Sequence, residues 1–186
     1  MTKARIVLAL VLALPAGLLA VDVKVDFDKT FDFRSIRTWN WAPDFGQVIM
    51  ARHKDDDPEA MRDRAEPIIV NAVAAEMAKL GLPRVDTVPD MTVMYYLLLS
   101  TNFNAQTVGQ FLPSTVQWGL PLFAPQTSSL EYMNQGSLVI DLRAKDVIVW
   151  RGLAQAKIKP DETAARREQL LRESVRDLLK RFPKRK

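Results

Sequence analysis

The sequence predicts an α+β fold: an antiparallel or mixed sheet of at least five strands, with two main helices packed on one face. Three observations support this class. Segments in which apolar residues alternate with polar ones recur along the chain, two longer segments carry apolar residues at helical spacing, and hairpins dominate without a regular strand–helix alternation. At 186 residues the chain is long enough for one domain with a substantial core.

The first two strands are predicted close to the N-terminus. Over residues 21–28, valine and phenylalanine alternate with charged residues, which is typical of a half-buried strand. A turn over 30–35 separates it from a second alternating segment, which begins at Ile36 and ends at Pro43. We expect residues 44–57 to form a loop.

The first helix is predicted to follow Asp57, a residue type that caps helices, with Pro58 at the first helical position. Apolar residues at helical spacing continue to Leu80, and Gly81 favours a stop directly after it. Pro67 lies inside this pattern. It either kinks the helix or marks its true beginning.

Three further strands and a second helix complete the prediction. Residues 90–100 are apolar on both faces, which indicates a strand that is covered on both sides. Residues 137–142 and 147–158 form two strands joined by a tight link, as in a hairpin. Asp161 is expected to cap the last helix, and Pro183 is expected to stop it.

The N-terminal segment 1–20 has the pattern of a cleavable signal peptide. Lys3 and Arg5 precede a continuous apolar run over 6–14, and Ala20 suits the residue before a cleavage site. The alternative is an N-terminal core helix or an uncleaved anchor. Cleavage would leave one α+β domain over 21–186, in the periplasm or secreted.

Absent residue types exclude several kinds of site. The chain has no Cys and a single His, so it carries no disulfide, thiolate nucleophile, iron–sulfur cluster or Cys-based zinc site. A lipid on an N-terminal Cys is excluded for the same reason, so we expect no lipid anchor of that kind.

The C-terminal segment is strongly basic. Residues 157–186 contain eleven bases and five acids, a net charge of +6, whereas residues 21–156 have a net charge of −4. Five bases of this segment are candidates for facing a polyanion such as a lipid surface or an envelope polymer: Arg166, Arg167, Arg172, Arg176 and Lys180. The alternative is a solvated helix face, on which Glu168 and Arg172 form an i,i+4 pair.

A second candidate surface lies in an uncharged stretch. No residue from Met91 to Leu130 is charged, and we interpret 101–135 as a long insertion in the domain. Four large apolar residues there are candidates for contacting a partner or a ligand: Phe111, Trp118, Leu122 and Phe123. The alternative is that these side chains cap the sheet as part of the core.

Sequence patterns for catalysis are weak. The acidic run ending at Asp57 lacks the spacing of a calcium loop, and His53 has no accompanying G-x-S-x-G motif. Strand and turn aspartates, including Asp141, offer paired carboxylates, but such residues are more often exposed to solvent. We therefore expect no enzyme activity, no catalytic residue, no metal, no cofactor and no nucleic-acid partner.

Four segments together give the chain a family resemblance. It resembles the bacterial domain-of-unknown-function family forty-one thirty-six (DUF4136), a group of envelope proteins often described as lipoproteins. The resemblance implies a cell-envelope location and carries over no activity, cofactor or site residue. The segments are Val25–Asp28 with Phe31–Phe33 and Arg37–Trp41, Leu80–Gly81 with Pro89–Val93, Gly136–Leu142 with Val149–Gly152, and Phe182–Pro183.

These observations predict an exported cell-envelope protein that acts as a non-enzymatic binding or accessory module. Its partner would be an unknown envelope protein or polymer, and a peripheral contact with an anionic membrane surface is also expected. The alternative is a periplasmic carrier of a small apolar ligand or lipid, held between sheet and helices.

Overall fold

The computed structural model describes residues 21–50, 57–99, 136–145, 147–156 and 162–184. In chain order its elements are β1 (Asp22–Phe27), the short 3-10 helix η1 (Phe33–Ser35), β2 (Trp39–Met50), α1 (Pro58–Lys79), β3 (Met91–Leu99), β4 (Gly136–Ala144), β5 (Val147–Ala156) and α4 (Ala164–Leu179). No helix in this part of the chain is long and apolar enough to cross a membrane.

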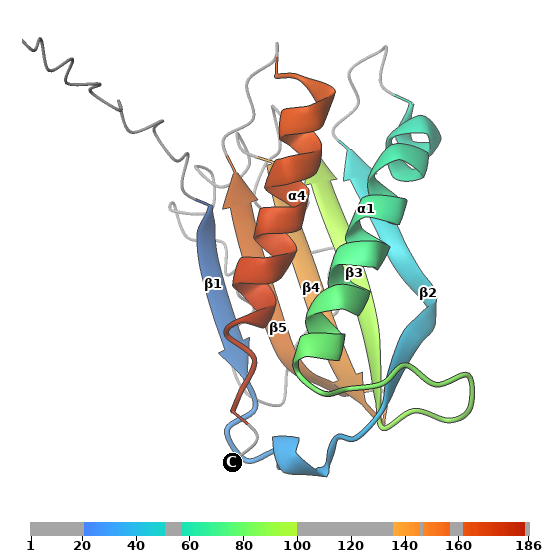
Figure 1. Cartoon of the computed structure of the whole chain (residues 1–186), viewed down its shortest axis with the longest axis vertical. Coiled ribbons are helices and arrows are strands. Elements are labelled where there is room, and N and C mark those ends of the chain that lie inside the picture. The colour runs from blue at the N-terminus through green and yellow to red at the C-terminus, as the bar shows by residue number, and fades with distance from the viewer. Residues whose placement is uncertain (1–20, 51–56, 100–135, 146, 157–161, 185–186) are drawn as a thin grey trace, which may run out of the picture.

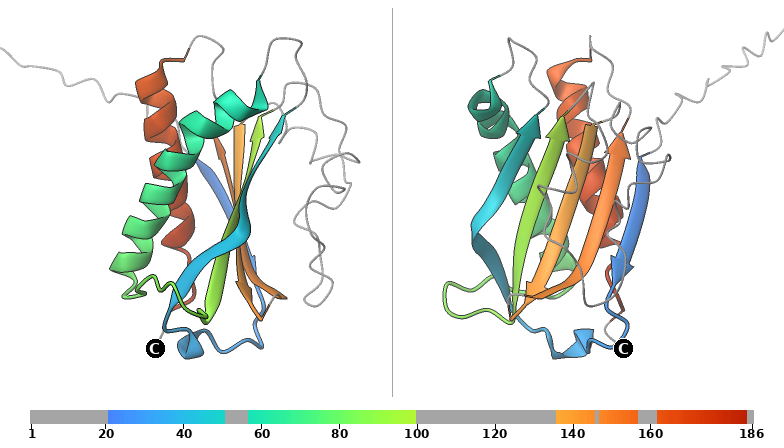
Figure 2. Two further views of the ribbon diagram at one scale, coloured as in Figure 1. Left: turned by 90° about the vertical axis from the view of Figure 1, so that its right-hand side faces the viewer. Right: turned by 180° about the vertical axis from the view of Figure 1, so that it is seen from behind.

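The strands form one mixed sheet in the order β1-β5-β4-β3-β2. β2 and β3 are parallel, and the other neighbouring pairs are antiparallel. Both long helices lie on the same face of the sheet (Figures 1 and 2). The predicted α+β class and the placement of two helices on one face are confirmed.

The parallel pair is joined by α1, which runs back across the sheet between β2 and β3 (Figure 1). β4 and β5 form the predicted hairpin, and Lys145 in its turn lies in the left-handed region with φ of 50°. As a result α1 and α4 both begin at the same end of the sheet, where β2, β3 and β5 end (Figure 1).

The core lies between the sheet and the two helices. It contains the strand side chains that face the helices, among them Trp39, Ile140 and Trp150, all at most 1% exposed. Ile69 from α1 and Val175 from α4 meet them and are fully buried. β3 is buried on both faces, as its apolar pattern predicts.

The prediction that the second strand ends at Pro43 is wrong. β2 continues to Met50, and its register with β3 shifts between Trp41 and Gly46. β2 is an edge strand, so a proline within the irregular segment removes no essential ladder hydrogen bond. The alternation of side chains is interrupted there, which hides the second half of the strand from a pattern analysis.

α1 is one continuous helix with Pro67 inside it, and the first alternative for this residue is confirmed. Proline lacks the N–H that would bond to the carbonyl of Asp63, which permits a bend. Figure 2 shows the helix changing direction in its N-terminal half. The predicted ends are also confirmed: Asp57 Oδ1 accepts a bond from Glu59 N at 2.9 Å, and Gly81 has φ of 70°.

The predicted cap of the last helix is wrong. α4 begins at Ala164, and Thr163 is its N-cap, with Oγ1 accepting a hydrogen bond from the N–H of Arg166 at 3.2 Å. Asp161 lies outside the described residues. Several residue types that cap helices stand close together before this helix, and the sequence does not decide among them.

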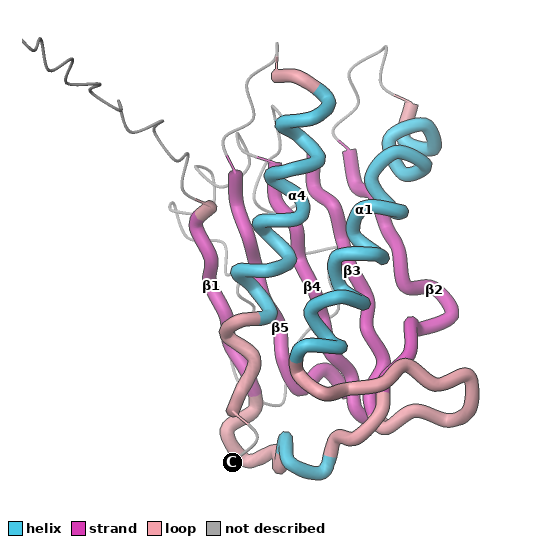
Figure 3. Tube along the Cα trace, viewed as in Figure 1, coloured by secondary structure: helices cyan, strands magenta, loops and turns pink. Residues whose placement is uncertain are grey.

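The segment after α1 is fixed against β2 at the lower end of the sheet (Figure 3). Trp39 Nε1 donates to the carbonyl of Leu82 at 3.2 Å, and Val85 N donates to the carbonyl of Trp39 at 3.0 Å. Asp90 accepts hydrogen bonds from the backbone N–H groups of Arg37 at 2.9 Å and Thr38 at 3.0 Å. These bonds lower the pKa of the Asp90 carboxyl.

Candidate functional site

An apolar cavity of about 500 Å³ lies between the N-terminal halves of α1 and α4 and the adjoining end of the sheet. We call it the inter-helix cavity. Figure 1 shows the two helices side by side, more widely separated at their N-terminal ends than at their C-terminal ends. The volume falls within the range of about 300–1,000 Å³ that is typical of ligand pockets.

Apolar side chains from all three layers form the cavity wall. α1 and α4 supply the two sides, and the ends of β3, β4 and β5 supply the floor. The apolar lining residues are Met61, Ala65 and Ile68 of α1, Leu97, Leu138 and Ala156 of the strands, and Ala164, Ala165, Leu170 and Leu171 of α4.

Small side chains explain why this space is not filled. Ala65 on α1, Ala156 on β5 and Ser174 on α4 are all buried and all line the cavity. Larger residues at such positions would normally pack to close the gap between two helices and a sheet. A void of this kind lowers stability unless another molecule occupies it.

The bend of α1 is held on the side of the helix that faces β2 and β3. Tyr95 of β3 donates a hydrogen bond to Glu66 Oε2 at 2.8 Å, and Arg62 Nε donates to the same oxygen at 3.0 Å. Gly46 allows this approach, because a Cβ atom there would lie 2.7 Å from both the Tyr95 hydroxyl and Glu66 Oε2. Burial, reinforced by the Glu66 carboxylate, raises the pKa of Tyr95.

Three charged residues also line the cavity. Arg64 of α1 and Arg167 and Glu168 of α4 all line it. Sequence reasoning named Arg167, but as one of five bases on an outward-facing surface. The alternative of an apolar ligand held between sheet and helices placed a pocket in this region, but sequence reasoning named neither Arg64 nor the small core-facing residues that leave the cavity open.

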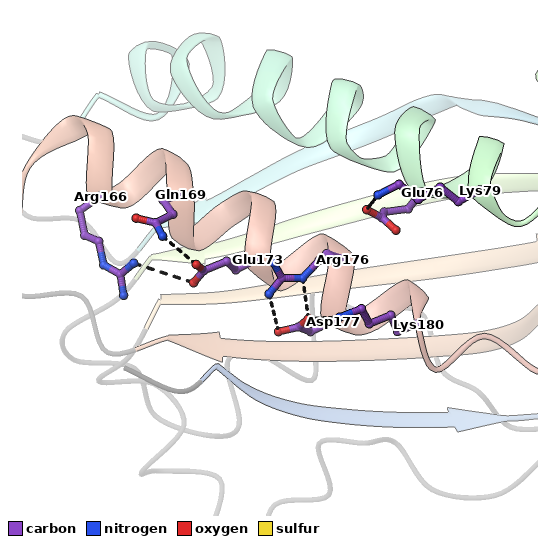
Figure 4. A network of polar contacts seen from close by, with 8 residues as sticks. All are labelled: Glu76, Lys79, Arg166, Gln169, Glu173, Arg176, Asp177 and Lys180. Atoms are coloured by element: carbon purple, nitrogen blue, oxygen red, sulfur yellow. Dashed lines mark hydrogen bonds and ion pairs between the residues drawn. The ribbon is translucent and has the colours of Figure 1, made fainter. Parts of the chain in front are cut away.

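The other four predicted bases lie along α4, and each is close to an acidic side chain. Arg172 Nη2 is 2.7 Å from Glu168 Oε1, which is the expected i,i+4 pair. Arg176 and Lys180 both pair with Asp177, and Arg166 Nη1 is 3.9 Å from Glu173 (Figure 4). The hydrogen bond from Arg176 lowers the pKa of Asp177.

A shallow polar groove of about 350 Å³ runs between the outer faces of the helices. Its walls carry the α4 network and, from α1, Glu76, which pairs with Lys79 at 2.7 Å (Figure 4). Most of its charged groups already have opposite charges beside them. The groove is therefore a weaker candidate for a binding site than the inter-helix cavity.

The predicted surface formed by Phe111, Trp118, Leu122 and Phe123 lies outside the described residues. The same holds for His53 and for most of the acidic run before α1. Within the described ranges, no group of three or more His, Asp or Glu side chains is arranged to hold a metal ion.

One buried pair of charges was missed by sequence reasoning. Arg151 of β5 and Asp141 of β4 lie on the sheet face opposite the helices, with side chains 1% and 0% exposed. Arg151 Nε donates to Asp141 Oδ1 and Nη2 donates to Oδ2, both at 2.6 Å. Burial raises the pKa of Asp141, and the guanidinium opposes that rise. A carboxylate held in this way is suited to a structural role.

Comparison with known proteins identifies related sequences and folds. The model of the domain-of-unknown-function family DUF4136 matches residues 23–184. A DUF4136 family protein from Bacteroides thetaiotaomicron has a similar structure, with 14% identity and a TM-score of 0.52, over 86% of this chain and 94% of that one.

A PDZ domain protein from Parabacteroides distasonis also has a similar fold. It shares 12% identity at a TM-score of 0.52, and the match covers 89% of this chain but only 36% of that protein. At these identities the likeness concerns the fold alone. No curated protein sequence matches the chain.

Proposed function

The chain belongs to the DUF4136 family, and from this premise we propose that it is a non-enzymatic binding protein of the bacterial cell envelope whose ligand is a small apolar molecule or a lipid acyl chain. The observation that carries the proposal is the inter-helix cavity, which has an apolar wall and a volume of about 500 Å³. The envelope location rests on the signal-peptide pattern of residues 1–20 and on the family resemblance.

The cavity suits an apolar chain better than a polar substrate. Its wall offers few hydrogen-bonding groups, so a buried polar ligand would lose its bonds to water without replacement. An alkyl chain has no such cost, and each buried methylene contributes about 0.8 kcal/mol. Affinity for a homologous series of alcohols should therefore rise about fourfold with each added methylene until the cavity is full.

Native mass spectrometry of the protein purified from its own envelope fraction tests this function directly. We expect a co-purifying apolar or lipid mass that disappears on denaturation. The neutral fluorophore N-phenyl-1-naphthylamine then measures occupation of the cavity. N-terminal sequencing of the same material tests export, with a mature chain that begins near residue 21 as the expected result.

Cavity-filling variants identify the site. Ala65→Leu and, separately, Ala156→Leu place added carbon atoms in the void and should weaken binding of the fluorophore at least tenfold. Both should keep or raise the melting temperature, because filling a void restores packing. Ala78→Leu is the matched control, since Ala78 is an exposed residue on α1 that does not line the cavity.

Two results would refute the proposal. One is the absence of fluorophore binding to the folded wild-type protein. The other is unchanged binding in whichever of the two filled variants folds.

A further inference from the structure

The two edges of the sheet are protected to different degrees. β1 carries a charged residue at every second position, Asp22, Lys24 and Asp26, and Arg181 Nη1 donates a hydrogen bond to the carbonyl of Val23 at 2.7 Å. Charged side chains and bonded backbone groups hinder the addition of a further strand to an edge. β1 is therefore poorly suited to pair with another chain.

β2 forms the opposite edge (Figure 1), and its first residues are covered by the segment after α1. Trp39 N donates to the carbonyl of Pro83 at 3.1 Å, and Val85 N donates to the carbonyl of Trp39 at 3.0 Å. Arg84 Nε adds a hydrogen bond to Asn40 Oδ1 at 2.9 Å. All of these bonds involve the first two residues of β2.

The second half of β2 pairs on one side only, within the part of the chain that the structure describes. Gly46 to Met50 are in parallel register with Tyr95 to Leu99 of β3, and β2 is the last strand in the sheet order. Such an edge presents a row of backbone N–H and C=O groups that can bond to a further strand. We call Gly46–Met50 the open edge.

The sequence of the open edge permits pairing with a copy of itself. Gly-Gln-Val-Ile-Met contains no charged residue and no proline, so two antiparallel copies bring no like charges together. The nearest charged residues in the sequence are Asp44 before it and Arg52 after it, the latter outside the described residues. In an antiparallel pair, the end of one copy that is flanked by Asp44 meets the end of the other that is flanked by Arg52. The charges are thus complementary under a two-fold axis.

We propose that two copies of this chain pair through their open edges, antiparallel and centred on Val48, so that their sheets join into one continuous sheet. An interface of this kind is isologous, because the same surface serves both partners. Backbone hydrogen bonds across the axis supply the affinity, and Asp44 and Arg52 favour the antiparallel orientation. The proposal is independent of the inter-helix cavity, since none of the described residues that line the cavity belongs to the open edge.

Sedimentation equilibrium of the protein purified from its envelope fraction measures the association. We expect a reversible equilibrium between monomer and dimer without larger species, because a two-fold interface closes on itself. A monomer at every concentration would overturn the proposal.

A spin label then locates the interface. The chain has no Cys, so Gln47→Cys introduces a single thiol at an exposed position of the open edge. Position 47 of one copy would lie about 7–8 Å diagonally from position 47 of the other, so the dimer should show strong dipolar broadening of the electron paramagnetic resonance spectrum. Asp86→Cys, on the exposed loop after α1, is the control and should show none. A dimer with an unbroadened label at position 47 would place the interface elsewhere and overturn the proposal.

Charge reversal tests the orientation. Asp44→Arg and, separately, Arg52→Asp should each weaken dimerisation about tenfold, since each brings like charges together at both ends of the pair. Asp44→Arg/Arg52→Asp should restore the wild-type dissociation constant, and Asp86→Arg, the same change outside the open edge, should leave it unaltered. Single reversals without effect, or a double variant weaker than both singles, would contradict antiparallel pairing. If a reversed variant fails to fold, the label at position 47 still decides the outcome.

Discussion

Arg151 and Asp141 face each other across β5 and β4 and share two hydrogen bonds of 2.6 Å, although neither side chain has appreciable contact with solvent. Both oxygens of the carboxylate are satisfied by one guanidinium. This geometry offsets the large cost of removing two charges from water. It also fixes the register of the hairpin, since a shift by one residue would separate the charges and bury each alone.

Removal of one member of this pair should be far more harmful than removal of both. We expect Arg151→Met to lower the free energy of unfolding by about 3–5 kcal/mol, because it leaves the Asp141 carboxylate buried without its partner. Urea denaturation followed by circular dichroism measures the change. In Asp141→Leu/Arg151→Met most of the loss should be recovered. A double variant as unstable as the single one would contradict this account.

Gly152 should not tolerate even a methyl group. A Cβ atom at this position would lie 2.6 Å from Leu178 Cδ2 of α4 and 2.5 Å from Cη2 of the Trp150 ring. We expect Gly152→Ala to lower the free energy of unfolding by about 1–3 kcal/mol through overpacking.

The same contact gives a test of the cause. Combined with Leu178→Ala, the Gly152→Ala change should cost less than it does alone, because the truncated side chain makes room. Additive effects of the two substitutions would show that overpacking against α4 is not the reason. Gly81→Ala offers a contrast: its cost of about 1–2 kcal/mol comes from a backbone with φ of 70° and should not respond to Leu178→Ala.

The stability of the protein should fall at alkaline pH partly through Tyr95. Its hydroxyl is buried and bonded to Glu66, which raises its pKa in the folded state, whereas unfolding returns it to about 10. The contribution is complete below pH 10 and is lost as the pH rises from 10 toward the folded-state value. Above pH 10, the wild-type free energy of unfolding should decline more steeply than that of Tyr95→Phe, by up to about 1.4 kcal/mol per pH unit. Identical slopes in urea titrations at pH 8–11 would rule this out.

Asp90 should stabilise the connection between β2 and β3. Asp90→Ala removes the acceptor for the N–H groups of Arg37 and Thr38, and we expect a loss of about 1 kcal/mol at neutral pH. Because these bonds lower the pKa of Asp90, the contribution is present above about pH 4 and is lost as the pH falls through the folded-state value. The difference from wild type should therefore shrink below pH 4, and a constant difference would contradict the role of the charged form.

The fold was predictable where one local pattern decided the structure. The alternation over 21–28, the apolar run after Asp90 and the hairpin of β4 and β5 each identify a strand without knowledge of its neighbours. Asp57, Pro58 and Gly81 likewise fix both ends of α1 by local capping chemistry. β2 was only half predicted, because its irregular segment interrupts the alternation on which strand prediction depends.

The candidate site was much less predictable. Arg64 and Arg167 are separated by more than a hundred positions in the chain, and only the packing of α1 beside α4 brings them to one cavity. Ala65 and Ala156 look like ordinary core residues in the sequence. An unfilled volume is a property of how three layers meet, so no single element encodes it.

By itself, the sequence determined the class of fold, most helix and strand positions and the resemblance to DUF4136, because these depend on side-chain periodicity and local backbone preferences. The tertiary structure decided which residues face one another: the pairing of Asp141 with Arg151, the contact of Gly152 with Leu178, and the cavity between α1 and α4. Such contacts join residues distant in the chain, and they arise only when apolar burial folds the sheet and helices together.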